Sequence, residues 1–178
     1  QVDPDQPFAI MYTSGTTGRP KGVIVSHRML RLSGEGVALV SAARDGDVMF
    51  MWEPLYHIGG AQMIVLPLIR RVSLALVERF SASAFWADVK STGATHIHYL
   101  GGILQILLKQ LPGPFDRAHG ASIAWGGGCP RDIWRAFEAY SIWTKTGTKD
   151  HTQSGFWGYL NWLTGYERWN QSGSILKN

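Results

Sequence analysis

Short runs of β-branched and aromatic residues alternate with longer segments of helical periodicity between residues 8 and 140 of this 178-residue chain. Alternation of this kind favours parallel strands with helices packed on both faces of the sheet. The pattern therefore predicts an α/β fold, layered, with a largely parallel sheet and flanking helices. The expected strands are 8–12, 23–25, 48–52, 72–77, 95–100 and 121–125. The expected helices are a segment capped by Ser26 that runs to about 43, then 58–68, 82–89, 103–111 and a segment that begins at Pro130.

The composition is that of a globular protein with 45% hydrophobic and 17% charged residues. A net charge of +4 without a basic stripe makes nucleic acid an unexpected partner. We expect no transmembrane segment, because the longest apolar stretch is short and is broken by Pro67, and no signal peptide is visible. The single cysteine, Cys129, excludes an internal disulfide framework and favours a reducing, cytoplasmic location.

The character of the sequence changes after Tyr140. Four of the eight tryptophans follow residue 142, among scattered small polar residues, and no periodicity is sustained there. We therefore expect two parts, residues 1–142 and an atypical Trp-rich tail at 143–178 that is frameshifted or appended.

A segment rich in Gly, Thr and Ser separates the first two expected strands. Glycines let main-chain N–H groups approach a ligand, hydroxyls add further donors and Lys21 adds a positive charge, which together suit a polyphosphate. The segment is not a Walker P-loop, because Pro20 precedes Lys21 and a strand follows. By composition alone, a flexible connection is an equal alternative. The candidate residues are Thr13, Ser14, Gly15, Thr16, Thr17, Gly18 and Lys21.

Three segments together resemble the adenylate-forming superfamily, the AMP-dependent synthetases and ligases. Residues 12–22 are similar to its signature phosphate loop, and residues 54–60 are similar to its Pro-Leu-Phe-His-x-x-Gly segment. Residues 126–130 resemble its Gly-Gly-Ala-Pro turn, with Cys129 where alanine is usual. Order and spacing match over about residues 3–140, and residues 80–86 resemble the carnitine/crotonobetaine–CoA ligase branch.

This resemblance implies a middle slice of the large N-terminal domain of an acyl-CoA synthetase, an enzyme of fatty acid or carnitine metabolism. In such enzymes a carboxylate attacks the α-phosphate of ATP, pyrophosphate leaves, and coenzyme A captures the acyl-adenylate. The resemblance implies catalytic roles for Lys21 near the pyrophosphate and for His57 beside the carboxylate pocket. It places Gly127, Gly128 and Cys129 along the adenine. The implied cofactors and partners are ATP, Mg²⁺, coenzyme A and a small-molecule carboxylate.

The sequence departs from the family after the helix at Pro130. It lacks the Tyr-Gly-x-Thr-Glu segment whose Glu helps to hold magnesium, the Tyr-Arg-Thr-Gly-Asp segment and the C-terminal domain. Three accounts remain: a truncated or frameshifted product, which the abrupt departure favours; one piece of a split enzyme completed by a second chain; or a divergent nucleotide-binding protein. We expect the chain alone to bind ATP with a roughly millimolar dissociation constant and to be inactive. The alternatives are a non-catalytic nucleotide-binding or interaction module and a non-functional remnant.

Other residues admit chemical roles that we weigh against structural ones. His96 and His98 share one face of an expected strand, which permits metal binding, but no third ligand lies nearby in sequence, so we predict no metal ligands. Cys129 at a helix start could be a nucleophile, although no histidine lies close in sequence. The tryptophans could stack on bases, but without a basic groove we expect them to pack in the core.

Overall fold

The computed structural model describes residues 2–12 and 18–127, part of a later helical segment and the backbone of two short strands. The strands β7 (Arg168–Trp169) and β8 (Ile175–Leu176) pair antiparallel. The remainder of the expected tail lies outside the described residues. The described residues of the helical segment are Asp132, Ile133, Ala136, Phe137 and Tyr140.

A four-stranded sheet with the order β4-β3-β5-β6 forms the centre of the molecule. Its strands are β3 (Val48–Met51), β4 (Ser73–Leu76), β5 (His96–Leu100) and β6 (Ile123–Gly127). All three neighbouring pairs are parallel. The predicted α/β fold with a largely parallel sheet is therefore confirmed.

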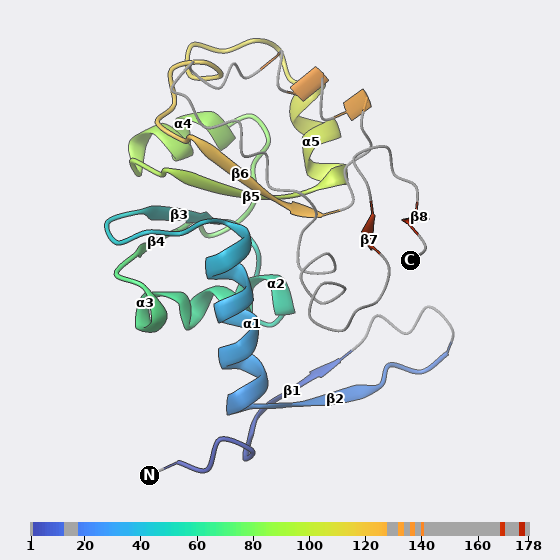
Figure 1. Cartoon of the computed structure of the whole chain (residues 1–178). Coiled ribbons are helices and arrows are strands. Elements are labelled where there is room, and N and C mark those ends of the chain that lie inside the picture. Colours follow the sequence, from blue (N-terminus) through green and yellow to red (C-terminus); the bar gives the residue numbers. More distant parts are fainter. Residues whose placement is uncertain are drawn as a thin grey trace.

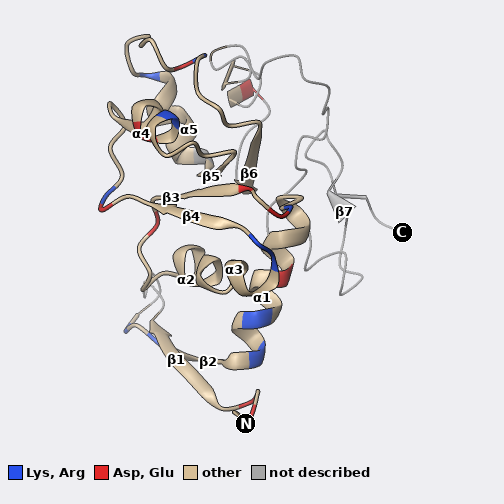
Figure 2. Cartoon of the chain, turned by 90° about the vertical axis from the view of Figure 1, so that its left-hand side faces the viewer, with Lys and Arg blue, Asp and Glu red and all other residues tan. Residues whose placement is uncertain are grey.

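Helices cover both faces of this sheet (Figure 1). On one face lie α4 (Phe85–Ser91) and α5 (Gly101–Leu108), and on the other lie α1 (His27–Val40), α2 (Ile58–Ile64) and α3 (Leu66–Ile69). An antiparallel hairpin of β1 (Pro7–Tyr12) and β2 (Gly22–Ser26) lies beyond α1 and α2 (Figure 2). The layered arrangement is thus also confirmed. None of the described helices is long and apolar enough to cross a membrane.

Two apolar clusters fill the spaces between the sheet and its helices. Phe50 and Phe85 belong to the cluster that includes α4 and α5, and Met49 and Leu66 belong to the cluster that includes α1 and α2. Trp86 lies in the first cluster with 5% of its surface exposed, and Trp125 lies in the second with 2% exposed. These two tryptophans confirm the prediction of core packing.

Helix α1 begins at the expected cap and packs closely against the helix pair beside it. The Ser26 side chain accepts a hydrogen bond from the Met29 backbone N–H at 3.3 Å, which satisfies one of the unpaired donors of the first turn. Farther along, a β-carbon at Gly34 would overlap the side chain of Val65. A glycine at this position therefore lets α1 approach the α2–α3 connection.

Several predicted boundaries are wrong, for identifiable reasons. The expected single helix at 58–68 is two helices, because Pro67 occupies the first turn of α3 and cannot continue the hydrogen-bond pattern of a preceding helix. The helix expected at 103–111 begins two residues earlier, at the end of β5, and ends at Leu108. Helix α4 begins at Phe85 rather than at residue 82, and β6 extends to Gly127 rather than to residue 125.

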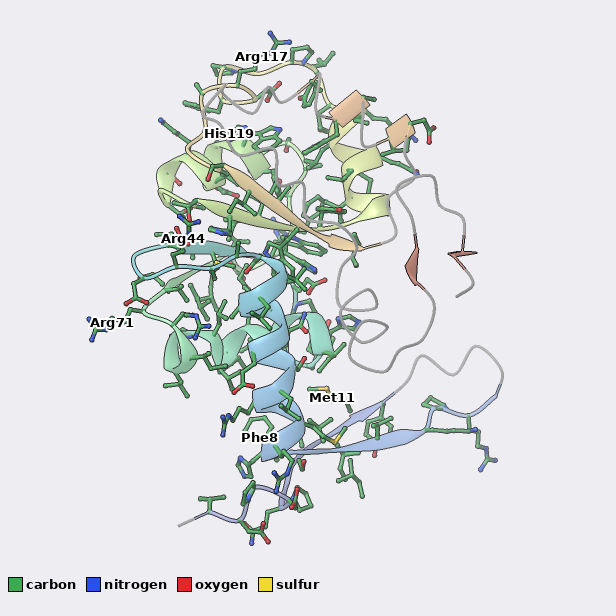
Figure 3. The ribbon with its side chains drawn as sticks, in the orientation of Figure 1. Phe8, Met11, Arg44, Arg71, Arg117 and His119 are labelled. Atoms are coloured by element: carbon green, nitrogen blue, oxygen red, sulfur yellow. The ribbon has the colours of Figure 1, made fainter. Side chains whose placement is uncertain are left out.

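The β1–β2 hairpin packs through part of one face, and its other face is exposed. Met11, labelled in Figure 3, and Val65 pack against a small cluster of Val25, Leu30 and Ala61. The exposed apolar side chains of the hairpin are Phe8, Ile10, Tyr12, Val23 and Ile24. The hairpin is therefore held to the rest of the molecule mainly through its inner face and the start of α1.

A buried polar cluster joins the end of α1 to the amino end of β5. The Nε2 of His96 lies 3.1 Å from the carbonyl oxygen of Ser41, and Nδ1 lies 2.8 Å from Oγ1 of Thr95. Because the carbonyl can only accept, Nε2 carries the proton of the neutral ring. Burial lowers the pKa of His96 and outweighs the carboxylate of Asp47, which lies 3.8 Å away and acts to raise it. The neutral imidazole is thus the form that the fold favours.

We expect the free energy of unfolding to fall as the pH drops below about 6.5, the ordinary pKa of histidine. The pKa of His96 is lowered in the folded state, so the unfolded chain takes up the proton first and the stability present above pH 6.5 is lost on acidification. Urea unfolding of wild type and His96→Gln at several pH values between about 8 and 5.5 measures this effect. The pH dependence should flatten in His96→Gln and persist in the control His27→Gln, whose side chain is half-buried. An unchanged slope in His96→Gln would contradict the assignment.

Candidate active site

The parallel sheet brings two of the three motif segments to one edge. Residues 54–60 follow β3, and Gly127 is the last residue of β6. Strand β5 lies between these two strands and is parallel to both. Because parallel strands present their carboxyl ends at the same edge, the two segments lie where open α/β sheets bind ligands.

His57 lies at this edge as the N-cap of α2. Its Nδ1 accepts a hydrogen bond from the backbone N–H of Gly59 at 3.1 Å. When the ring is neutral, the proton is therefore on Nε2, which can donate to another group. The side chain is exposed, so this donor is accessible to an anion such as a carboxylate.

The two glycines that follow His57 allow the first turn of α2 to pack tightly on the end of β3. A β-carbon at Gly59 would overlap the carboxylate of Glu53, and one at Gly60 would overlap the carbonyl oxygen of Pro54. Both glycines are buried. Their function in the segment is thus close packing.

Glu53 is a buried acidic residue at this edge that the sequence analysis missed. Its Oε2 lies 3.3 Å from Nδ1 of His98, and the two side chains are 5% and 10% exposed, respectively. The contact is short enough for an ion pair, but its geometry is not that of a hydrogen bond, and Oε2 has no hydrogen-bond partner within the described part of the chain. The one indication of Glu53 in the sequence was that an acidic residue directly follows an apolar strand.

Two aromatic rings lie beside His98. The ring centroid of Trp125 is 4.2 Å from that of His98, and the ring of Trp52 is stacked at 6.3 Å. Trp52 also donates its Nε1–H to the backbone carbonyl of His98 at 2.9 Å. His96, which shares the strand face, instead contacts Ser41 and Thr95. Within residues 2–12 and 18–127 and the few described beyond them, no three His, Cys, Asp or Glu side chains form a metal-binding group.

The expected phosphate loop connects the two strands of the hairpin. Tyr12 pairs with Gly22, and of the residues between them the structure describes 18–21. Gly18 adopts a φ of 148°, which L side chains rarely adopt, and Lys21 is exposed directly before β2. Outside the described residues lie the predicted site residues Thr13, Ser14, Gly15, Thr16, Thr17, Gly128 and Cys129.

The two glycines that end β6 have different surroundings. Gly126 is opposite Tyr99 of β5, and a β-carbon at Gly126 would overlap the carbonyl oxygen of Tyr99. Gly127 is opposite Leu100, and a β-carbon there would meet no atom of the described residues within 4 Å. Gly126 is therefore required for strand pairing, whereas the described residues leave the space beside Gly127 unfilled.

Comparison with known proteins gives consistent matches. Residues 1–146 match the AMP-binding enzyme family. The chain is 41% identical over 133 residues to the long-chain fatty acid transport protein 2 of Rattus norvegicus, a match that covers 74% of this chain and 21% of the relative. It is 37% identical over 116 residues to the crotonobetaine/carnitine–CoA ligase of Salmonella paratyphi A, a match that covers 65% of this chain and 22% of the relative.

The fold also matches solved structures. The o-succinylbenzoate coenzyme A synthetase of Bacillus subtilis, in complex with ATP and magnesium ion, superimposes with a TM-score of 0.67 and 26% identity. This match covers 78% of the chain and 29% of the solved structure. The chain thus spans less than a third of each of these proteins.

We expect Gly126→Ala to destabilise the fold by about 3 kcal/mol, because the added methyl group must separate β5 from β6. Gly127→Ala is the matched control, since its methyl group enters open space. Urea unfolding followed by circular dichroism compares the two variants with wild type. Equal stability of Gly126→Ala and Gly127→Ala would contradict the close approach of Gly126 to Tyr99.

Proposed function

Because this chain belongs to the AMP-binding enzyme family, we propose that it forms the nucleotide- and carboxylate-binding part of an ATP-dependent acyl-CoA synthetase. In the first step a carboxylate oxygen attacks the α-phosphorus of ATP, and pyrophosphate leaves with the electron pair of the broken P–O bond. In the second step the thiolate of coenzyme A attacks the acyl carbon, and AMP leaves. The observation that carries this proposal is the shared edge on which His57 and Gly127 lie.

The geometry supports separate roles for the three segments. Nε2 of His57 donates to the carboxylate substrate, since Nδ1 is occupied by the Gly59 N–H. The open space beside Gly127 accommodates the adenine, together with Gly128 and Cys129. Lys21 and the loop of residues 13–18 donate to the phosphates as pyrophosphate leaves. The ends of β1 and β2 that carry this loop point to the same side of the molecule as the carboxyl end of β6 (Figure 1).

Magnesium and coenzyme A enter the proposal through the family. The solved structure of one relative contains ATP and magnesium ion. Another relative is named as a CoA ligase, and this name indicates that coenzyme A is its co-substrate. The described residues offer no group of three or more metal ligands, so we assign no step of the reaction to the ion. A cytoplasmic location suits a chain with a single cysteine.

We expect saturable ATP binding with a dissociation constant of roughly 1 mM, measured by calorimetry or by ³¹P NMR. Lys21→Ala should weaken it about tenfold or more, since a hydrogen bond to a charged group contributes about 1.5–3 kcal/mol. Lys90→Ala is the control, because Lys90 is an exposed lysine on α4, which packs on the opposite face of the sheet from the hairpin. Equal affinities of wild type and Lys21→Ala would count against the phosphate loop.

Carboxylate-dependent exchange of label between ATP and pyrophosphate tests the chemistry directly. Acetate, octanoate and carnitine serve as probes of small, apolar and cationic acids. We expect ATP binding without exchange for any of these acids, because the chain spans less than a third of each of its relatives. Exchange that requires one of these acids and is lost in Lys21→Ala would contradict the expectation that the chain alone is inactive.

A further inference from the structure

We propose that Glu53 is a positioning residue for His57. The relevance of this role to a carboxylate substrate rests on the proposed function, whereas the role itself is a statement about the fold. The contacts run from His98 on β5 to Glu53 after β3, then to Gly59 in α2 and finally to the ring of His57. No residue of this series other than His57 has been assigned to the site.

Each contact in the series is short. Oε2 of Glu53 lies 3.3 Å from Nδ1 of His98, within ion-pair distance but without hydrogen-bond geometry. The same carboxylate packs directly against Cα of Gly59, where even a methyl group would not fit. The backbone N–H of Gly59 then donates to Nδ1 of His57 at 3.1 Å. The position of the carboxylate therefore determines where this N–H lies, and the N–H determines which nitrogen of His57 carries the proton.

Burial shows that Glu53 acts through other residues. Its carboxylate oxygen is inaccessible to solvent, so a substrate has no access to it in this arrangement. A buried carboxylate that lacks a full set of hydrogen bonds also costs stability relative to an apolar side chain of the same size. Groups that are costly to bury concentrate at functional sites, where their placement serves the site rather than the fold.

The same residues fit a structural metal site poorly. His98 and Glu53 would supply two ligands, and within the described residues no third ligand completes a group. The rings of Trp125 and Trp52 already lie beside the His98 ring, with centroids 4.2 Å and 6.3 Å away. The contact between His98 and Glu53 is therefore better explained by a role in positioning the turn after β3 than by metal binding.

The test measures the tautomer of His57 by ¹⁵N NMR of the imidazole nitrogens in the full chain, at the alkaline end of a pH series in which these shifts no longer change. In wild type, Nδ1 should show the shift of an unprotonated nitrogen and Nε2 that of a protonated one. In Glu53→Ala the turn loses its support, and both shifts should move toward the average of the two tautomers. Unchanged His57 shifts in a folded Glu53→Ala variant would overturn the proposal.

The control is Gln62→Ala, a matched truncation of a buried polar side chain in α2. Oε1 of Gln62 accepts a hydrogen bond from the Ser33 hydroxyl of α1 at 3.0 Å, and Gln62 makes no contact in the series above. The Gln62→Ala substitution should lower the melting temperature but leave the tautomer of His57 unchanged. If Gln62→Ala alters His57 as much as Glu53→Ala does, the effect is general loosening of α2, and the proposal fails.

A second variant serves if Glu53→Ala does not fold. Gly59→Ala keeps the backbone N–H, but its methyl group must displace the flexible end of Glu53. It should therefore produce the same change at His57, whereas Gly102→Ala, whose methyl group enters open space, should produce none. Retention of the wild-type His57 shifts in Gly59→Ala would overturn the proposal in the same way.

Titration with sodium octanoate separates this inference from the proposed function. If both hold, octanoate shifts the Nε2 signal of His57, and its affinity is about threefold to tenfold weaker in Glu53→Ala than in wild type. A wild-type chain whose His57 does not respond to octanoate counts against carboxylate binding, while the tautomer comparison still decides the role of Glu53. Equal octanoate affinities in the two proteins would contradict the positioning role.

Discussion

The close backbone approach between β5 and β6 is the constraint on which the rest of the arrangement depends. The carbonyl oxygen of Tyr99 occupies the volume that a side chain at Gly126 would need. With β6 held in this register and β3 on the other side of β5, the three carboxyl ends share an edge. The positions of His57 and Gly127 follow from this edge, because each lies within a few residues of a strand end.

Histidines two residues apart on one strand illustrate how place determines role. His96 lies at the amino end of β5, where Ser41 and Thr95 satisfy its ring and burial favours the neutral form. His98 lies farther toward the carboxyl end, where its ring meets Glu53 and two tryptophans. One histidine joins a helix to the sheet, and the other contributes to the edge where ligands bind in this kind of fold.

Local patterns in the sequence were sufficient for the layers but not for all boundaries. The cap at Ser26 and the apolar runs of the strands predicted α1 and the parallel sheet, because these signals are local. The division at Pro67 and the early start of α5 depend on how the chain leaves a strand or turn, which periodicity does not encode. The contact of Glu53 with His98 could not be assigned from sequence, since it joins a residue just after β3 to a residue on β5. Gly126 and Gly127 are alike in sequence, and the structure distinguishes them by the position of Tyr99 and by the φ of 158° at Gly126.

The hairpin that carries Lys21 is packed on one face only, and this has a mechanical consequence. Its inner face is held by Met11 and Val25, whereas its outer face presents aromatic and aliphatic side chains to solvent. A two-stranded ribbon supported on one side bends more easily than one enclosed on both sides. Any surface that covers Phe8, Ile10 and Tyr12 would therefore support the hairpin from outside, and it would limit how far the described ends of β1 and β2 move relative to the sheet edge.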